Sequence, residues 1–538
     1  MWKSAARRTS LRRRRLFSSS AAPNVADTIY ALSTAQGRAG IAVVRISGPA
    51  CLEIYKALCP TKVLPKPRYA SVRTLYHPQE PSTVLDSEAL ILHFPAPRTV
   101  TGEDVLELHV HGGPATVKAV LSVIPLCGRQ IRYADPGEFT KRAFFHDRLD
   151  LAQIESLSDT LDAETEQQRR AAVRGNSGAL GRTYEAWREE LLQARGEIEA
   201  LIDFSEDQHF DESPTDLLDN VTAQVEDMLR SIKAYEDGSQ RSELLRNGIR
   251  IALLGPPNVG KSSLMNLIVG REASIVSGEA GTTRDIVEAS LDIRGYLCSF
   301  ADTAGFRSDA SASEHSDLNS GPVGAVEKEG IRRARQKAEE SDLVIVLASV
   351  EVGTDGPFIY YDKETLKLAA TAESAMVVIN KADTGLDLEE QLAAFRQVIS
   401  QEIPALTKTG DLITISCKEA RVPPPSTAAR RHRDPGRIQD VVSTLVHAFS
   451  AMTELPVDMQ DLLGVTERQR QLLSQCREHL EDYLAESQAE EGREADAVLA
   501  AEHLRYAADC LARITGKGEA GDVEDVLGVV FEKFCVGK

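Results

Sequence analysis

The chain has 538 residues, 42% of them hydrophobic, which is enough to build the cores of about three domains. Its formal net charge of −19 excludes broad binding to a nucleic-acid backbone unless a local basic patch or a second subunit supplies positive charge. A run of about 18 apolar residues does not occur, so we expect no membrane span, and the cysteines form no CxxC pair, which fits a reducing compartment.

Residues 1–26 are predicted to be a mitochondrial transit peptide. They are rich in arginine and serine and contain no acidic residue before Asp27, and the stretch RLFS at residues 15–18 resembles a processing site. The alternative is a disordered basic tail that contacts nucleic acid or a membrane.

The rest of the chain changes its pattern three times. Residues 27–139 mix strand-like runs with glycine and proline, which predicts a compact α+β domain. Residues 140–246 and 438–538 show helical periodicity. Residues 247–437 alternate apolar strands with helices, which is typical of a parallel, doubly wound sheet, and end in a linker-like insertion at residues 421–437. The simplest architecture is a discontinuous all-α helical domain with an inserted Ras-like α/β P-loop G domain.

The stretch GPPNVGKSS, residues 255–263, follows an apolar strand and opens a helix, which is the setting of a P-loop. In such a loop the backbone N–H groups cradle phosphate oxygens, Lys261 reaches the β- and γ-phosphates, and Ser262 offers its hydroxyl to Mg²⁺. The nucleotide-binding residues predicted here are Asn258, Val259, Gly260, Lys261, Ser262 and Ser263.

Two further segments are expected to complete the phosphate site. The segment DTAG comes just after a β-prone run and would place its aspartate near the metal and its glycine amide near the γ-phosphate. In GTTRD, residues 281–285, Thr283 would close on Mg²⁺ when the γ-phosphate is present, which makes this segment a candidate switch. The DTAG residues predicted to bind the nucleotide are Asp302, Thr303, Ala304 and Gly305.

The segment NKAD, residues 380–383, indicates that the nucleotide is GTP and not ATP. A carboxylate at Asp383 can accept hydrogen bonds from both N1–H and the 2-amino group of guanine, whereas adenine has no donor at N1 and would leave the charge unpaired. The segment SCK fits the last guanine-contacting loop. The predicted base contacts are Asn380, Lys381, Asp383, Ser416, Cys417 and Lys418.

The residue after DTAG raises a question about mechanism. Ras-like GTPases have a glutamine there that orients the attacking water, but this chain has Phe306, which carries no polar side-chain atom. Together, GPPNVGKSS, GTTRD, DTAG and NKAD resemble the MnmE/TrmE family of tRNA-modification GTPases. The resemblance covers nearly the whole chain after residue 26, through the stretches DTIYALSTAQGRAGIAVVRISG, TGEDVLELHVHGGP, PGEFTKRAFFHDRLDLAQ and FEKFCVGK.

The resemblance implies a potassium-activated mechanism. In the family, K⁺ takes the place of an arginine finger when two G domains pair, and a glutamate downstream of DTAG helps to order the water. That glutamate matches Glu327, with Glu329 as a close rival, because residues 308–322 look like an insertion. The matching potassium ligands are Asn258, Ser277, Glu279 and Thr282.

The resemblance also implies that the N-terminal domain binds a tetrahydrofolate and mediates formation of a homodimer. The expected ligand is 5,10-methylenetetrahydrofolate or 5-formyl-tetrahydrofolate. Cations suit the glutamate tail of folate, and a carboxylate can accept from the amino-pyrimidine of the pterin. The matching residues are Arg45, Glu107, Arg148 and Lys538. Cys535, in the C-terminal tail, is the matching catalytic residue for the modification chemistry.

The function implied by the resemblance is that of a mitochondrial matrix GTPase that works on tRNA with an FAD-dependent, MnmG-like partner. The pair would convert C5 of the wobble uridine to an aminomethyl-type derivative, carboxymethylaminomethyl or taurinomethyl, with glycine or taurine as the amine. The alternative is a ribosome-assembly GTPase similar to Era and Der, which would have the same nucleotide motifs. Against it, the sequence has no KH-type GXXG loop in a basic setting.

Overall fold

The structure is a computed structural model that describes residues 27–204, 214–271, 273–276, 290–300, 335–336, 338–354, 356–384, 388–404, 406, 412–422, 434–487 and 496–517. These residues form two compact units, residues 27–150 and residues 151–517, and each is treated by itself. Within the described part of the chain, no helix is both long and apolar enough to cross a bilayer.

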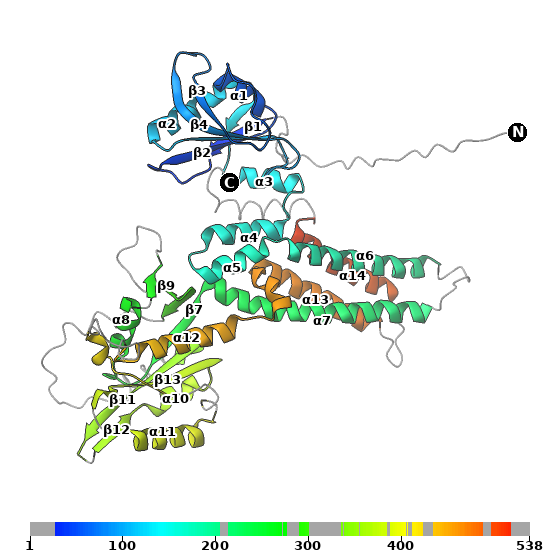
Figure 1. The fold of residues 1–538 in the computed structure, drawn as a ribbon. Coiled ribbons are helices and arrows are strands. Elements are labelled where there is room, and N and C mark those ends of the chain that lie inside the picture. Colours follow the sequence, from blue (N-terminus) through cyan, green and yellow to red (C-terminus); the bar gives the residue numbers. More distant parts are fainter. Residues whose placement is uncertain are drawn as a thin grey trace, which may run out of the picture. The chain divides into compact units, whose positions relative to one another are not determined.

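The first unit, drawn in blue and cyan in Figure 1, contains a sheet. This sheet has six strands in the order β3-β4-β5-β2-β1-β6. Neighbouring strands are antiparallel except for β1 and β6, which are parallel. Buried and exposed residues alternate along β2, so one face turns towards the core, where α1 and α2 pack. The elements are β1 (Thr28–Leu32), β2 (Ile41–Ser47), α1 (Cys51–Leu58), β3 (Ser71–Tyr76), β4 (Val84–Phe94), β5 (Val105–His111), α2 (Pro114–Val123), η1 (Ile124–Cys127), β6 (Ile131–Tyr133) and α3 (Glu138–Phe145).

A buried arginine of α3 contacts the residue before β1 and the loop before β5. Arg142 is only 1% exposed. Its Nη2 atom lies 2.6 Å from Asp27 Oδ1 and 3.2 Å from Glu138 Oε1, and its Nη1 atom lies 3.0 Å from Glu103 Oε1. A charge removed from water needs such partners, because an unpaired buried ion is very costly. The network therefore holds α3 in the first unit, although the sequence pattern placed the change to helical structure near residue 140.

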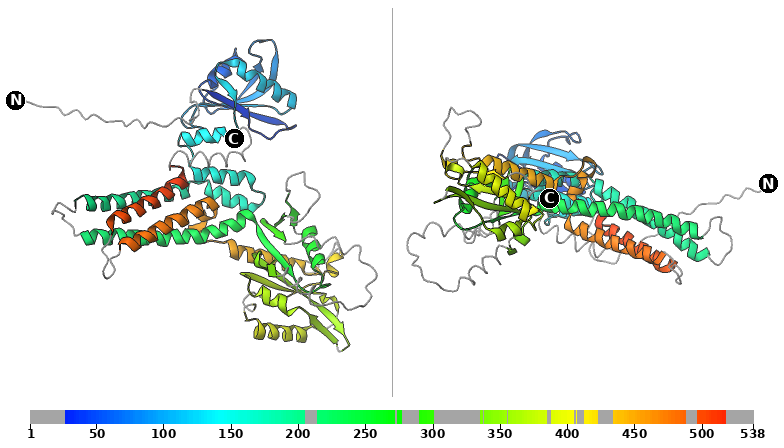
Figure 2. Two further views of the ribbon diagram at one scale, coloured as in Figure 1. Left: turned by 180° about the vertical axis from the view of Figure 1, so that it is seen from behind. Right: turned by 90° about the horizontal axis from the view of Figure 1, so that it is seen from below.

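The helical part of the second unit has one core built from four long helices, α6, α7, α13 and α14, which lie side by side in Figures 1 and 2. Tyr184, Val225, Leu480 and Leu504, one from each helix, belong to this core. Helices from both sides of the α/β segment therefore pack together. The elements are α4 (Leu151–Asp162), α5 (Glu166–Gly175), α6 (Ala179–Phe204), α7 (Pro214–Asn247), η7 (Val457–Gly464), α13 (Glu467–Ser487) and α14 (Ala497–Thr515).

The α/β part of the second unit is an eight-stranded sheet with the order β14-β13-β11-β7-β10-β9-β8, in which β12 also pairs with β11. Strands β14, β13, β11, β7 and β10 are parallel, and the others join antiparallel. The strands are β7 (Ile249–Leu254), β8 (Ala273–Ile275), β9 (Ser290–Ile293), β10 (Tyr296–Phe300), β11 (Leu343–Gly353), β12 (Gly356–Tyr360), β13 (Ser374–Asn380) and β14 (Ile413–Thr414).

Helices cover both faces of this sheet, as a doubly wound fold requires. Residues of α8 and α12 share one core with the sheet, and residues of α10 and α11 share the other. The remaining elements are α8 (Lys261–Arg271), α10 (Lys363–Ala369), η3 (Ala382–Thr384), α11 (Glu389–Glu402), η5 (Glu419–Arg421) and α12 (Ile438–Thr453). The parallel α/β sheet predicted for this segment is present, while the domain boundaries predicted from the sequence remain predictions.

Helix α12 packs against the sheet and not within the four-helix core. The sequence pattern had assigned residues from 438 onwards to the helical domain. Phe449 is fully buried, and its ring centroid lies 5.6 Å from that of Tyr296 on β10. The other buried α12 residues in this sheet core are Ile438, Val441, Val442 and Leu445. An apolar stripe shows that a helix face is buried, but it does not show which partner buries it.

Candidate nucleotide-binding site

The carboxyl ends of the parallel strands border a cavity of about 640 Å³. This edge is where open α/β sheets bind their ligands. Three segments that the sequence predicted to bind GTP meet here: the P-loop after β7, NKAD at the end of β13, and SCK after β14. The lining residues are Asn258, Gly260, Ser263, Val350, Glu351, Val352, Asn380, Lys381, Asp383, Thr384, Cys417, Lys418 and Arg421.

The P-loop has the backbone conformation that a phosphate cradle needs. Asn258 and Gly260 both have positive φ, at 63° and 100°. A Cβ atom at Gly260 would lie 2.2 Å from Asn380 Nδ2, so only glycine fits at this position. Lys261 is the first residue of α8, and its Nζ atom donates to the carbonyl oxygens of Gly255 at 2.8 Å and Pro256 at 2.7 Å. The lysine thus lies over the loop whose N–H groups and helix terminus suit an anion.

Asn380 connects the P-loop to the last loop of the site. Its side chain is almost fully buried. The Nδ2 atom donates to Val259 O at 2.7 Å, and Oδ1 accepts from Cys417 N at 3.1 Å. A buried amide needs both kinds of partner, and here the two partners come from segments far apart in the sequence. Asn380 therefore holds two walls of the cavity together.

The contacts of Asp383 favour its ionised form, which can only accept hydrogen bonds. Its Oδ1 atom accepts from Ser416 Oγ at 2.9 Å, and its Oδ2 atom lies 3.5 Å from Lys418 Nζ. Burial opposes ionisation, but the Ser416 hydrogen bond and the Lys418 charge outweigh it, so the pKa of Asp383 lies below its ordinary value. A carboxylate at this edge of the cavity can accept two hydrogen bonds from guanine, and adenine cannot supply them.

The cavity also contains two charged residues that the sequence patterns did not single out. Glu351, near the end of β11, has its Oε1 atom 2.5 Å from Lys381 Nζ, and this hydrogen bond holds the pKa of Glu351 below its ordinary value. Arg421 donates from Nη2 to Ser263 Oγ at 3.1 Å. The available signal for Glu351 was its place near the carboxyl end of a buried parallel strand. Arg421 was assigned to a solvated linker, yet it forms part of the cavity wall.

The cysteine of the SCK segment is a wall residue. Burial raises the pKa of the Cys417 thiol to about 11, so the thiol is protonated near neutral pH.

The phosphate and metal side of the site includes many predicted residues that lie outside the described part of the chain. These are Ser277, Glu279, Thr282, Thr283, Asp302, Thr303, Ala304, Gly305 and Glu327.

A second cavity, of about 290 Å³, lies in the first unit. Glu107 and Arg148 line it, and Arg148 Nε donates to Thr99 O at 3.0 Å. Arg45 stands opposite Glu107 in the β2–β5 register, and its Nε atom donates to Glu107 Oε1 at 3.0 Å. Three of the four residues predicted to bind folate therefore come together, while Lys538 and Cys535 lie outside the described residues. The cavity also contains Arg68 and Arg98, which sequence reasoning missed because no motif links them to Glu107.

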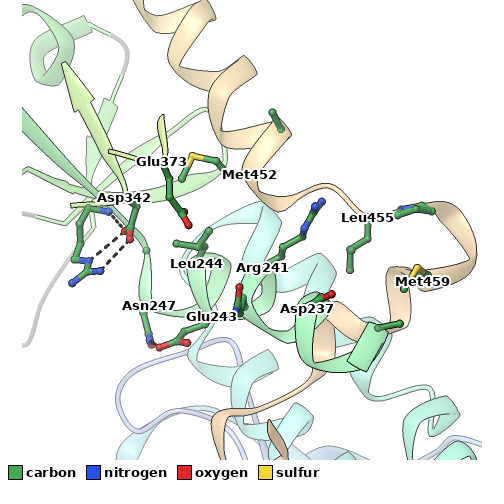
Figure 3. A pocket seen from close by; sticks show the side chains of 17 residues that line it. Asp237, Arg241, Glu243, Leu244, Asn247, Asp342, Glu373, Met452, Leu455 and Met459 are labelled. Atoms are coloured by element: carbon green, nitrogen blue, oxygen red, sulfur yellow. Dashed lines mark hydrogen bonds and ion pairs between the residues drawn. The ribbon is translucent and has the colours of Figure 1, made fainter. Parts of the chain in front are cut away.

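A larger cavity, of about 890 Å³, lies at the opposite edge of the eight-stranded sheet, between α7, the end of α12 and the amino ends of the strands (Figure 3). In Figure 3, Arg241 of α7 points towards Leu455, and it donates a hydrogen bond to Glu454 O. Arg250 Nη2 lies 3.0 Å from Asp342 Oδ1 at the cavity wall. The lining contains no residue predicted for nucleotide, folate or metal binding.

A doubly wound sheet with a P-loop after β7 and the ionised aspartate of the NKAD segment after β13 is typical of a P-loop GTPase. The family model described as "MnmE helical domain" matches residues 151–535, and the model described as "GTP-binding protein TrmE N-terminus" matches residues 28–148. The chain belongs to the MnmE (TrmE) family.

Full-length relatives agree with this assignment. A "tRNA modification GTPase MnmE" from Parvibaculum lavamentivorans is 41% identical over 514 residues, which are 95% of this chain and 100% of that protein. The mitochondrial "5-taurinomethyluridine-[tRNA] synthase subunit GTPB3" of Danio rerio is 37% identical, and the match covers 95% of this chain and 93% of that protein.

Among solved structures, a crystal structure of Era with a fragment of 16S ribosomal RNA is 21% identical. The match covers 43% of this chain and 66% of the Era chain, with a TM-score of 0.24.

Proposed function

We propose that this chain is a mitochondrial, potassium-activated GTPase that acts with an FAD-dependent, MnmG-like partner to modify C5 of the wobble uridine in tRNA. The observation that carries the proposal is the ionised Asp383 in a cavity bounded by the P-loop, in a chain of the MnmE family. The family's relatives are named as tRNA modification GTPases, and several of those names include "mitochondrial". The transit peptide at residues 1–26 and the matrix location belong to the same proposal.

Within the cavity, the described residues would have different roles in binding GTP. Asp383 would accept from the guanine base, and Asn380 would keep the base-binding loop and the P-loop in register. Lys261 would leave its carbonyl partners for the β- and γ-phosphates, and Ser262 would bind Mg²⁺ together with Thr283 and Asp302. Glu351 would fix Lys381 under the base, because the two side chains are already paired.

A potassium ion would supply the positive charge that an arginine finger supplies in other GTPases. Asn258 fits this role because it lines the cavity from a left-handed turn and carries an amide oxygen, a ligand suited to a weakly hydrated cation. Ser277, Glu279 and Thr282 would complete the ligand set, and Glu327 would order the attacking water. The ion would bind when two copies of the G domain pair in the homodimer.

The test of this mechanism is GTP hydrolysis in KCl and in NaCl at equal ionic strength. We expect hydrolysis to be at least about tenfold faster in KCl, since an arginine finger in this position contributes about 10³-fold or more. The variant Asn258→Gly keeps the positive φ while it removes the ligand, so its rates in the two salts should converge. Equal rates for the unmodified protein in the two salts would refute potassium activation.

The first unit would bind a tetrahydrofolate as the one-carbon donor. Arg68, Arg98 and Arg148 give the cavity the positive charge that a glutamate tail requires, and Glu107 is an acceptor for the pterin. The volume lies near the lower end of the range for small-molecule pockets, so the cavity suits one end of the cofactor better than the whole of it. The C-terminal residues Cys535 and Lys538 would complete the site.

Mass spectrometry of wobble uridines in mitochondrial tRNA from cells without this gene tests the substrate. Loss of a carboxymethylaminomethyl or taurinomethyl group would support the proposal and would identify glycine or taurine as the amine. Unchanged nucleosides would favour the alternative, an Era- or Der-like assembly GTPase. In cells that carry Cys535→Ser, the modification should be lost while GTP hydrolysis by the purified variant continues, and full modification would exclude the role of Cys535.

A further inference from the structure

Two histidines and one aspartate meet on the pair of helices α13 and α14. His479 and Asp482 are three positions apart on α13, so they share one face of that helix, and His503 lies on α14. One ligand atom from each of the three side chains lies within 4.8 Å of the others. His503 Nδ1 lies 3.8 Å from Asp482 Oδ2. None of the three residues lines the nucleotide cavity or the cavity of the first unit.

The spacing of these atoms is close to that of a metal site. Zinc binds histidine nitrogen and carboxylate oxygen at about 2.0–2.2 Å in a tetrahedral arrangement, which places neighbouring ligand atoms about 3.3–3.6 Å apart. The three side chains would need to converge by about 1.5 Å at most, which small side-chain rotations provide.

The histidines have ring nitrogens that the rest of the described chain leaves unsatisfied. The Nδ1 atoms of His479 and His503 are buried, and neither has a hydrogen-bond partner among the residues that the structure describes. A buried polar atom without a partner costs free energy, because it has lost its hydration. On one side, the ring of Tyr506 packs 5.3 Å from that of His479, centroid to centroid. Asp482, whose side chain is 60% exposed, leaves a path from solvent.

We propose that His479, Asp482 and His503 bind a divalent first-row transition-metal ion of the Zn²⁺ class, with solvent in the remaining position. Two imidazoles and one carboxylate suit Zn²⁺ and its neighbours, whereas Mg²⁺ and Ca²⁺ prefer oxygen ligands alone. The ion links α13 to α14 at the partly exposed surface where these two helices pair. Because the ligands come from two helices, binding stabilises the folded helical part of the second unit.

Metal binding by the full chain tests this proposal. After treatment with a chelator, the protein is titrated with ZnCl₂ and, separately, with CoCl₂. We expect one tight equivalent of Zn²⁺ per chain, a higher melting temperature with Zn²⁺ than without it, and the intense visible absorption of four-coordinate Co²⁺. His503→Ala and the isosteric Asp482→Asn should each weaken Zn²⁺ binding by more than about tenfold, since even outer-shell partners of metal ligands contribute that much.

The control is His447→Ala, which removes an exposed histidine of α12 that is not in the cluster and should leave metal binding unchanged. The affinity for GDP serves as a measure of intact folding, because neither His503 nor Asp482 lines the nucleotide cavity. Zn²⁺ affinities equal to that of the unmodified protein in folded His503→Ala and Asp482→Asn would place any bound metal elsewhere and overturn the proposal. Absence of a tight equivalent in the unmodified protein would also overturn it.

Discussion

Two residues on either side of Asp383 decide its charge before a nucleotide binds. Ser416 donates to one carboxylate oxygen, and Lys418 lies near the other. Since the pKa of Asp383 lies below its ordinary value, the carboxylate is ionised throughout the physiological pH range. Asp383 therefore presents a fixed negative charge at this edge of the cavity and not a titrating group.

Replacement of this charge should change which base the protein binds. In Asp383→Asn, the amide presents a donor where guanine also presents donors, so we expect GTP affinity to fall by about 100-fold or more. Xanthosine triphosphate, which has a carbonyl at C2, should bind the variant better than GTP does. Competition with a fluorescent GDP analogue measures both affinities. Asp227→Asn, an exposed change on α7, is the matched control, and an unchanged base preference in Asp383→Asn would contradict the assignment.

The carboxylates around Arg142 make the first unit sensitive to acid. Burial opposes ionisation of Glu138, but its hydrogen bond and charge interaction with Arg132, together with the charge of Arg142, hold its pKa below the ordinary value of 4.5. A lowered carboxyl pKa stabilises the fold above the unfolded-state pKa, and this stability is lost as the pH falls through the folded-state pKa.

Glu138→Gln should therefore lower the stability of the first unit at pH 7 and make it less dependent on pH below about 4.5. Urea unfolding at pH 7, 5 and 3.5 measures the effect. Glu88→Gln, an exposed change on β4, should keep both the stability and the pH dependence of the unmodified protein. A Glu138→Gln variant with the same loss of stability in acid as the unmodified protein would show that this carboxylate is not the sensitive group.

Helix α12 stabilises the eight-stranded sheet, because the sheet is the element that buries its apolar face. Its buried stripe fills one face of the eight-stranded sheet, on the same side as α8, whose first turn forms part of the P-loop. The chain just before it is also fixed to the sheet, since Ser416 N donates to Gly436 O at 3.1 Å and Arg437 Nη1 donates to Thr414 Oγ1 at 2.8 Å. The helix thus stabilises the face of the sheet that also carries α8, and with it the wall of the nucleotide cavity.

Truncation of the largest buried side chain of α12 should destabilise the sheet. Phe449→Ala removes a ring that is fully buried against Tyr296, and such changes cost about 3–5 kcal/mol. Because the sheet positions the P-loop, GDP affinity should fall in parallel with stability. Chemical denaturation followed with a bound fluorescent nucleotide measures both. Val457→Ala, at a side chain that is 85% exposed, is the control, and equal stability of the two variants would show that α12 does not support the sheet.

As a whole, the described chain is two compact units with separate hydrophobic cores. The nucleotide cavity lies entirely in the second unit, and the smaller arginine-lined cavity lies entirely in the first. A ligand stabilises only the part of a protein whose folded state binds it. Each ligand is thus expected to report on its own unit.

Calorimetry should resolve two unfolding transitions. GDP at about 100 times its dissociation constant should stabilise the second unit by about 2.7 kcal/mol and leave the first transition unchanged. Arg142→Met should lower the first transition alone, because loss of the buried arginine leaves Glu103 without its cationic partner and leaves Asp27 and Glu138 with Arg132 only, at a cost of about 3–5 kcal/mol. A single transition that moves as a whole with GDP would show that the two units unfold as one.

The sequence by itself determined the parts of this protein whose chemistry is local. A P-loop needs glycine at the positive-φ position 260 and a lysine at the start of a helix, and both lie within one short stretch. The alternation along β2 and the continuous apolar run of β11 likewise follow from neighbours in the chain, and they indicate burial on one face or on two. The class of fold, the family and the choice of guanine could therefore be predicted.

Tertiary structure decided everything that depends on which distant segments meet. Glu351 and Arg421 became cavity residues only when β11 and the loop after β14 reached the same edge of the sheet. The sequence of α12 specifies a buried face, but packing selected the sheet as its partner. His479 and His503 are ordinary helical residues until α13 and α14 pair. The hydrophobic pattern of a segment indicates which of its faces must be buried. The positions of side chains from distant segments relative to each other are fixed by the packing of the folded chain.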